Sequence, residues 1–315
     1  MPAIVMAEVP TVKLPNGAEM PVIGLGTYKS EPGEVTQAVK DAIDIGYRHI
    51  DGAHFYGNEK EVGEAIRAKI AEGVIKREDI FYTGKLWNTF HRPGAVEPAL
   101  RTTLADLGLD YVDLYLMHWP VAYEEGGDLT PKDANGKIVF ADHDYVDTWK
   151  ALEEVCEKGL AKNIGVSNFN KEQLERLLKT ARIQPVTNQV ECQPLLAQVE
   201  LSEFCKSRGI VITAYRPIGG LGKPGEPKLR EDPKLASIAK KYNKTISQIL
   251  LRYQVDRGHV AIPKSVNKYR IKENFEIFDF ELSKEDVKLI TSMDRHLRLC
   301  QIPDWIDSPY YPFEK

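Results

Sequence analysis

The 315-residue sequence lacks most of the features that mark secreted, membrane-spanning or metal-binding proteins. Its four cysteines are widely scattered without a C-x-x-C pair, so neither a disulfide framework nor a zinc site is indicated. No apolar run reaches the roughly 18 residues that would span a bilayer. The first residues, MPAIVMAEVP, lack the basic segment of a secretory signal. We therefore expect a cytoplasmic protein with reduced thiols and no membrane partner.

An excess of charge of one sign is also missing. The 42 basic and 46 acidic residues give a formal net charge of -4, without the basic block that would follow a phosphate backbone. Nucleic acid is therefore not an expected partner. Hydrophobic residues make up 43% of the chain, which is enough to bury a large core. We expect a single barrel-sized domain over residues 1–315.

A repeating pattern follows the first 21 residues: an apolar, β-branched run, a polar loop and an amphipathic helix. Near-continuous apolar runs are typical of strands that are covered on both faces. About eight such units in about 250 residues favour a (β/α)8 TIM barrel of the α/β class over a doubly wound sheet. Helices are predicted to begin near Asn58 and after Asn170, which has the capping partner Gln173 three residues on. The apolar runs are residues 22–28, 49–53, 80–86, 112–119, 163–169, 185–192, 211–215 and 259–265.

Four segments lie outside this repeat. Residues 11–23 contain the dipeptide Asn16-Gly17 between two short extended runs, which predicts a β-hairpin cap. Residues 120–144 and 216–233 predict long loops on the catalytic face of the barrel. The tail, residues 295–315, is rich in aromatic residues and proline, and we expect it to fold over the barrel mouth.

Polar side chains fall at the C-terminal ends of seven of the predicted strands. In barrels of this kind that end carries function, whereas polar residues at the other end are structural. Each residue alone is more often a solvated charge or a packing residue, so the inference depends on their common rim. These residues are Asp51, Lys85, His118, Ser167, Asn168, Gln189, Tyr215, Lys264 and Ser265.

The rim residues, together with Tyr56 from a loop, indicate carbonyl chemistry. A phenol with its ordinary pKa near 10 is a poor acid, but an ammonium from Lys85 would lower the pKa of Tyr56 while Asp51 holds the lysine charged. His118 could donate a hydrogen bond that orients a substrate carbonyl. The set contains neither a nucleophile with a base nor three metal ligands. A hydride source is therefore needed, and a nicotinamide cofactor is implied.

Aromatic residues near the rim predict an apolar mouth suited to a hydrophobic carbonyl compound. Ordinary aromatic packing is the alternative reading for each one. The residues assigned to substrate binding are Tyr28, Phe55, Tyr56, Trp87, His118, Trp119 and Trp305.

Two segments compete as phosphate sites. Residues 220–225 match G-x-G-x-x-G, but Pro224 and Pro227 forbid the helix that this fingerprint needs, so we predict a mobile loop there. The better site is the segment of residues 264–274, where backbone N–H groups at a helix start combine with lysine and arginine. A solvated basic loop remains the alternative for this segment.

The sequence resembles the aldo-keto reductases from about Val12 to the C-terminus. This resemblance implies NADPH-dependent reduction of a ketone or aldehyde by a monomeric (β/α)8 barrel without a metal. Within the family the chain looks similar to insect members of the 3-dehydroecdysone reductase type, so a 3-oxo ecdysteroid is one candidate substrate beside aromatic aldehydes. The matching segments are GLGTY (24–28), RHIDGAHFYGNEKEVGEAI (48–66), KLWNTFH (85–91), LDYVDLYLMHWP (109–120), GLAKNIGVSNFN (159–170), NQVECQP (188–194) and IPKSVNKYRIKENF (262–275).

The resemblance also implies roles for single residues. Tyr56 matches the general acid, Asp51 and Lys85 its partners, and His118 the residue that orients the carbonyl. Tyr215 matches the ring that stacks on nicotinamide. The resemblance further implies that the segment 264–274 selects NADPH over NADH. The implied cofactor contacts are Gly26, Thr27, Tyr28, Asp51, Ser167, Asn168, Gln189, Tyr215, Arg216, Ile218, Lys264, Ser265, Val266, Asn267, Arg270, Glu273 and Asn274.

Three residues depart from the family pattern. Gly52 stands where a small hydroxyl or thiol residue is usual, Gly84 where serine or threonine precedes the lysine, and Arg216 where serine follows the stacking tyrosine. These departures concern cofactor affinity more than reaction type, and Gly52 leaves space beside Asp51. Because a fold does not determine function, the alternative is a cofactor-binding regulatory subunit with little turnover. A phosphate-binding barrel enzyme of other chemistry is a third hypothesis.

Overall fold

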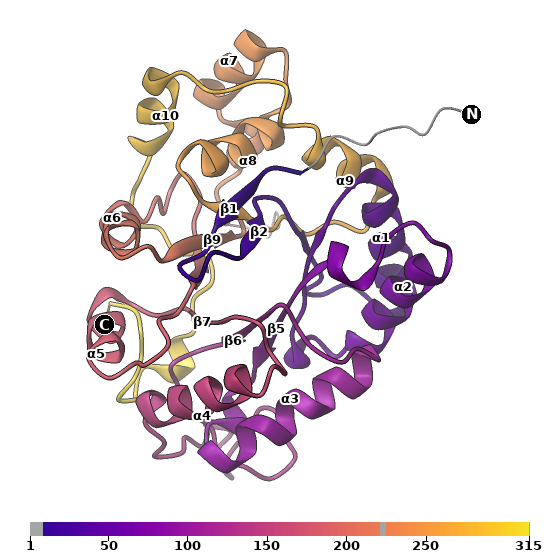
Figure 1. Ribbon diagram of the computed structural model, residues 1–315. Coiled ribbons are helices and arrows are strands. Elements are labelled where there is room, and N and C mark those ends of the chain that lie inside the picture. Colours follow the sequence, from indigo (N-terminus) through magenta and orange to yellow (C-terminus); the bar gives the residue numbers. More distant parts are fainter. Residues whose placement is uncertain (1–8, 221–224, 315) are drawn as a thin grey trace.

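The computed structural model describes residues 9–220 and 225–314. Within these ranges, parallel strands form one sheet in the order β10-β9-β8-β7-β6-β5-β4-β3. Parallel bridges join Ile23 to Ala261 and Gly26 to Lys264, so the first strand also meets the last and the sheet closes into a barrel (Figure 1). The strands are β3 (Leu25–Gly26), β4 (His49–Asp51), β5 (Phe81–Leu86), β6 (Leu114–Met117), β7 (Ile164–Ser167), β8 (Thr187–Glu191), β9 (Val211–Tyr215) and β10 (Val260–Ala261).

Each strand lies inside one of the predicted apolar runs, and nearly every strand residue is buried. The reason is that side chains on one face fill the barrel and those on the other face pack under the surrounding helices. The predicted (β/α)8 barrel is therefore confirmed.

Helices surround the barrel (Figure 1). The predicted start after Asn170 is confirmed, because its side chain accepts from the Gln173 N–H while Gln173 bonds back to the Asn170 N–H. The helix after Asn58 also begins as predicted. The helices are α1 (Pro32–Ile45), α2 (Glu59–Ala71), α3 (Pro93–Leu107), α4 (Tyr145–Glu157), α5 (Lys171–Leu178), α6 (Val199–Ser207), α7 (Pro233–Tyr242), α8 (Ile246–Asp256), α9 (Lys268–Phe275) and α10 (Lys284–Thr291).

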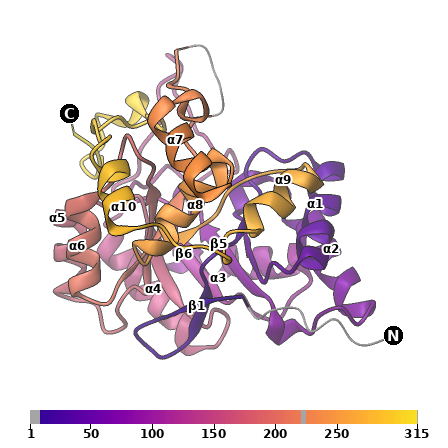
Figure 2. The ribbon, with the colours of Figure 1, turned by 90° about the horizontal axis from the view of Figure 1, so that it is seen from above.

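The predicted hairpin is formed by β1 (Thr11–Lys13) and β2 (Glu19–Pro21), which pair antiparallel. Gly17 has a φ of 83°, a value that favours glycine, and the side-chain oxygen Oδ1 of Asn16 accepts from the Ala18 N–H at 3.1 Å. Leu14 and Met20 pack on residues at the N-terminal ends of the barrel strands. The hairpin thus closes the end opposite to the C-terminal tail (Figure 2).

The tail closes part of the other end, as predicted. Backbone N–H groups of Leu299 and Cys300 donate to the Glu191 carboxylate, at the end of β8, at 2.9 and 2.6 Å. Trp305 lies in the short helix η5 (Pro303–Trp305), and its ring is 4.8 Å from Trp119 between centroids. No helix in the described ranges is long and apolar enough to cross a membrane.

The two long loops also lie at this end. Residues 120–144 are folded rather than open, because antiparallel bridges join Tyr123 to Phe140 and Lys132 to Ile138. Residues 216–233 contain one helical turn, η4 (Leu229–Glu231). Most of the G-x-G-x-x-G match, residues 221–224, lies outside the described residues.

Candidate active site

The centre of the site is the ammonium of Lys85, which is fully buried in β5. Its Nζ donates to Asp51 Oδ1 at 2.6 Å, to the Gly52 carbonyl oxygen at 2.9 Å and to the Tyr56 hydroxyl at 3.0 Å. Asp51 ends β4, and Tyr56 ends the adjoining helical turn η1 (His54–Tyr56). Three strand-end and loop residues that are separate in sequence are thus brought together.

This geometry leaves the hydroxyl proton of Tyr56 available. An ammonium has three N–H donors, and all three of those on Lys85 are used. Since the Tyr56 oxygen accepts from Lys85, its own hydrogen must point away from the lysine. The Tyr56 ring lies 5.8 Å from the His118 ring and 5.0 Å from Tyr28, between centroids. Tyr56 can therefore donate on the side of the site that carries His118.

The electrostatic expectation for Tyr56 was wrong in sign. Removal of water from its hydroxyl raises the pKa of Tyr56 well above 10, and the negative charge of Asp51 raises it further. Burial and Asp51 therefore outweigh the nearby ammonium. The consequence is that the burial of Tyr56 favours its protonated form. The contact with Lys85 then acts mainly after proton transfer, when the positive charge of the ammonium would stabilise the Tyr56 phenolate.

Burial also lowers the pKa of the Lys85 ammonium, while the Asp51 carboxylate opposes that shift by charge and by hydrogen bonding. The pKa of His118 is held well below 6.5, first by burial and then by the charge of Lys85. His118 is therefore a neutral imidazole. A neutral imidazole carries one N–H, so it can donate a hydrogen bond without carrying charge.

The residues predicted to hold the cofactor carboxamide form a connected group at the ends of β7, β8 and β9. Ser167 Oγ donates to the Gln189 carbonyl oxygen at 2.8 Å, and the Asn168 amide donates to the His118 carbonyl oxygen at 3.1 Å. The Tyr215 hydroxyl donates to Asn168 Oδ1 at 2.7 Å. Asn168 has a φ of 62°, and this turn directs its amide to both neighbours.

One contact within this group was missed. The Gln189 amide donates to Asp51 Oδ2 at 2.8 Å, so Asp51 is held by Lys85 on one oxygen and by Gln189 on the other. No sequence signal points to this contact, because 138 residues separate the two partners. Thr27 holds the main chain of the same residue, since its hydroxyl donates to the Asp51 backbone carbonyl oxygen at 2.8 Å.

The predicted phosphate segment surrounds the start of α9. Asn267 caps this helix by accepting from the Arg270 N–H at 3.1 Å, and the Ser265 hydroxyl accepts from the Asn267 N–H at the same distance. Lys264 and Arg270 are exposed, and the Arg270 guanidinium makes no ion pair with another described residue. Two cationic groups and a helix start thus face solvent together, as a phosphate site requires.

The remaining predicted cofactor residues occupy varied positions. Glu273 accepts from the Thr245 hydroxyl at 3.0 Å, and Asn274 is buried on the inner side of α9. Arg216 has a φ of 50° and lies 3.8 Å from the Glu226 carboxylate within its own loop. The other three pack close to the barrel: Gly26 in β3, with Ile218 and Val266 against the core.

The predicted aromatic mouth is present at the same end. Phe55 stacks on Trp87 with centroids 3.7 Å apart, and Trp87 lies 5.2 Å from His118. The Trp87 indole N–H donates to the Leu129 carbonyl oxygen at 2.6 Å and so ties the loop 120–144 to β5. Tyr123 is part of the same aromatic cluster but was not predicted, because loop residues follow no hydrophobic period.

Comparisons with known proteins show which proteins this chain resembles along nearly its whole length. Aldo-keto reductase family 1 member C15 of Rattus norvegicus is 51% identical over 313 residues, covering 96% of this chain and 97% of the relative. Prostaglandin-E(2) 9-reductase of Oryctolagus cuniculus is 50% identical over 312 residues, covering 96% and 97%. The solved structure of the aldose reductase from Schistosoma japonicum is similar with a TM-score of 0.93 at 43% identity, covering 98% of this chain and 99% of that chain.

None of these named proteins is an insect 3-dehydroecdysone reductase, so the narrower resemblance gains no support from them. The family model described as "Aldo/keto reductase family" matches residues 22–295. With this match, and with relatives about half identical along nearly their whole length, the chain belongs to the aldo/keto reductase family and is an NADP-dependent oxidoreductase.

Proposed function

We propose that this protein reduces a hydrophobic ketone or aldehyde to an alcohol, with Tyr56 as the general acid. The observation that carries the proposal is the single ammonium of Lys85 in contact with both Asp51 and the Tyr56 hydroxyl. A neutral His118 lies next to that hydroxyl. This arrangement can hold a carbonyl oxygen between two hydrogen-bond donors, which is what stabilises negative charge developing on that oxygen.

The residues present fit a nicotinamide dinucleotide. Amide and hydroxyl groups for a carboxamide come from the ends of β7 and β8, and the Tyr215 ring adjoins them. The exposed Lys264 and Arg270 at the start of α9 would hold a 2′-phosphate. When bound there, NADPH supplies the hydride.

The chain itself supplies the proton and the alignment. His118 orients the carbonyl by donating a hydrogen bond, and Tyr56 donates its proton to the oxygen as the alcohol forms. Lys85 stabilises the phenolate that remains, and Asp51 keeps the lysine in place, supported by Gln189. The proton on Tyr56 is then restored from solvent.

The substrate class follows from the aromatic mouth. The residues Asp51, Tyr56, Lys85 and His118 are called the tetrad below. Rings of Phe55, Trp87, Trp119 and Trp305 line the same end as the tetrad and favour an apolar body attached to the carbonyl. One relative is named prostaglandin-E(2) 9-reductase, which supports including prostaglandin E2 in a substrate screen. A 3-oxo ecdysteroid is the narrower candidate beside aromatic aldehydes. We assign a cytoplasmic monomer, which light scattering after size exclusion would test.

The test is the substitution Tyr56→Phe, assayed by NADPH oxidation over a panel of aromatic aldehydes, 3-oxo steroids and ecdysteroids. We expect kcat to fall by about 10²–10⁴-fold, because the proton donor is lost, while NADPH binding measured by protein fluorescence is retained. Near-normal turnover in Tyr56→Phe would refute the assigned acid. Cofactor binding without turnover of any carbonyl by the wild type would instead favour the regulatory subunit.

A further inference from the structure

The space beside Asp51, left open by Gly52, is filled by the buried phenol of Tyr82. A Cβ added to Gly52 would lie 2.2 Å from the Tyr82 hydroxyl oxygen, which is far inside contact distance. A Cβ added to Gly84 would lie 3.4 Å from Cε1 of the same ring. Tyr82 is completely buried. A contact of 3.4 Å is ordinary, so Gly84 could carry a Cβ, and only Gly52 makes room for the Tyr82 side chain.

Tyr82 holds a second buried carboxyl group behind the site. Its hydroxyl donates to Glu59 Oε1 at 3.1 Å, and the Thr103 hydroxyl donates to Glu59 Oε2 at 2.9 Å. Glu59 begins α2 and is only 4% exposed. Its nearest basic group in the described residues is His54 Nδ1, 3.9 Å away, and burial lowers the pKa of that histidine. Glu59 is thus buried among neutral donors, without a cation in direct contact.

Burial makes the charge of such a carboxyl group sensitive to pH. Burial raises the pKa of Glu59 to about 7, against the two hydrogen bonds and the charge of Lys85, which lower it. The titratable and charged groups that face Glu59 come from every element around it: His54 of η1, Tyr82 and Lys85 of β5, Tyr115 of β6 and Asp106 of α3, which in turn pairs with the exposed Lys60 of α2.

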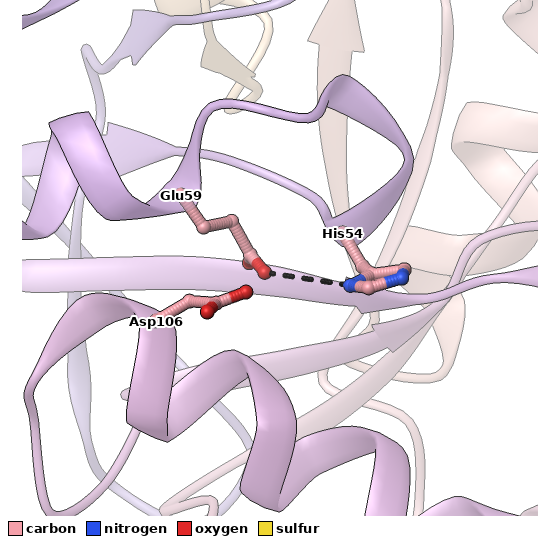
Figure 3. Close-up of side chains that lie close together, drawn as sticks. All are labelled: His54, Glu59 and Asp106. Carbon is pink, nitrogen blue, oxygen red and sulfur yellow. Dashed lines mark ion pairs between the residues drawn. The ribbon is translucent and has the colours of Figure 1, made fainter.

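A route for proton exchange leads from Glu59 to solvent. His54 and Asp106 flank its carboxyl group (Figure 3), and one ligand atom of each of the three residues lies within 4.8 Å of the others. The side chains of His54 and Asp106 are 25% and 28% exposed, whereas that of Glu59 is 3% exposed. His54 and Asp106 are therefore two partly exposed titratable groups through which a proton can pass between solvent and Glu59.

We propose that Glu59, which accepts hydrogen bonds from Tyr82 and Thr103, is a positioning residue for Lys85 and Tyr56, the pair that donates the proton. The ionised Glu59 helps to keep the Lys85 ammonium charged beneath Tyr56, and uptake of a proton by Glu59 weakens that support. This inference rests on the proposed function of Tyr56. The physical basis is a chain of contacts: Lys85 Nζ donates to the Gly52 carbonyl oxygen at 2.9 Å, the Tyr82 hydroxyl lies against Gly52, and that hydroxyl donates to Glu59 at 3.1 Å. The negative charges of Asp51 and Glu59 both oppose the loss of the Lys85 proton that burial favours.

The direction of the effect can be tested by removing the charge alone. In Glu59→Gln, Lys85 loses its proton at a lower pH, so activity should fall earlier on the alkaline side. We expect the ratio of mutant to wild-type kcat to be about threefold lower at pH 9 than at pH 6, with KM for NADPH changed less than about twofold. Tyr82→Phe removes one donor and keeps the ring, so its pH profile should move in the same direction by less.

The matched control is Glu153→Gln. Glu153 is also a buried carboxyl group, on α4, where it accepts from the backbone N–H groups of Arg182 and Ile183, away from the tetrad. Unlike Glu59 it also pairs with a cation, the Arg182 guanidinium, at 3.2 Å. Its variant should lose stability but keep the wild-type pH profile. A folded Glu59→Gln with the wild-type ratio at both pH values would overturn the inference, as would an equal pH shift in Glu153→Gln.

A readout without turnover separates this inference from the proposed function. Infrared spectra of the wild type should show a protonated-carboxyl band at pH 6 that disappears by about pH 8.5, and Glu59→Gln should lack it. If no carbonyl is reduced but this band titrates, the proposed function fails while the buried proton-exchanging carboxyl stands. If carbonyls are reduced but the band is absent at pH 6, the inference on Glu59 fails alone.

Discussion

Replacing Gly52 with alanine should destabilise the protein far more than a glycine-to-alanine change normally does. The added Cβ would lie 2.2 Å from the Tyr82 hydroxyl oxygen and 2.9 Å from Cζ, whereas ordinary contacts begin at 3.4 Å. The ring must therefore move by about 1 Å inside a close-packed interior. Movement on that scale would also break its 3.1 Å hydrogen bond to Glu59.

The size of the effect follows from these two losses. Overpacking of a core costs about 1–3 kcal/mol, and a buried acceptor left without its donor costs about 1–3 kcal/mol more. We expect the free energy of unfolding of Gly52→Ala to fall by about 2–5 kcal/mol, measured by urea denaturation as a lower midpoint at unchanged slope. Gly33→Ala is the control, because a Cβ there would meet nothing within 4 Å.

A double-mutant cycle isolates the cause. Tyr82→Leu removes the phenol ring, so Gly52→Ala introduced into that background should cost less than about 1 kcal/mol. If Gly52→Ala is as mild as Gly33→Ala in the wild type, or if its cost is the same with and without the Tyr82 ring, then Tyr82 does not fill the space beside Asp51.

Two further predictions concern the cofactor and pH. Arg270→Ala should raise KM for NADPH by about tenfold or more and leave KM for NADH nearly unchanged, because a 2′-phosphate loses a charge-assisted contact. Lys272→Ala is the control, since Lys272 is exposed on the same helix. Equal effects of Arg270→Ala on both cofactors would remove the assignment of Arg270 to the 2′-phosphate. His49 is buried and neutral, since burial lowers its pKa to about 4 from 6.5. The contribution of neutral His49 to the free energy of unfolding should be fully present above pH 6.5 and be lost as pH falls towards 4. The reason is that in this range the unfolded chain protonates His49, whereas the folded chain keeps it neutral. Urea midpoints between pH 7.5 and 4.5 should therefore fall more steeply for the wild type than for His49→Gln, and parallel curves would contradict this.

The sequence predicted the strands well because burial on both faces leaves a local signal, a continuous apolar run. It predicted the start of α5 because Asn170 and Gln173 satisfy the first turn locally. Asn58 shows the limit of such signals. Its helix begins as predicted, but its amide instead donates to the Thr27 and Ser30 carbonyl oxygens across the site, each at 3.0 Å. Residue propensity predicts where the helix begins, but tertiary contacts determine which groups the Asn58 side chain binds.

The rim residues could be named from the sequence because parallel strands all present their C-terminal ends to one side. The contacts among them could not. The bond from Gln189 to Asp51 joins distant strands across the barrel, and the raised pKa of Tyr56 depends on how much water the surrounding chain removes. Both are properties of the closed barrel and of its packing.

The stretch from Asp51 to Glu59 separates the two kinds of information most clearly. By itself the sequence determined the barrel, the common rim and the residue types for proton donation, since these follow from period and position. Only the tertiary structure decided that the space at Gly52 is occupied by Tyr82 and that this phenol holds Glu59 in the interior. The reason is physical: which side chain enters a gap depends on volumes and donors contributed by segments far apart in the chain, and no local pattern records them.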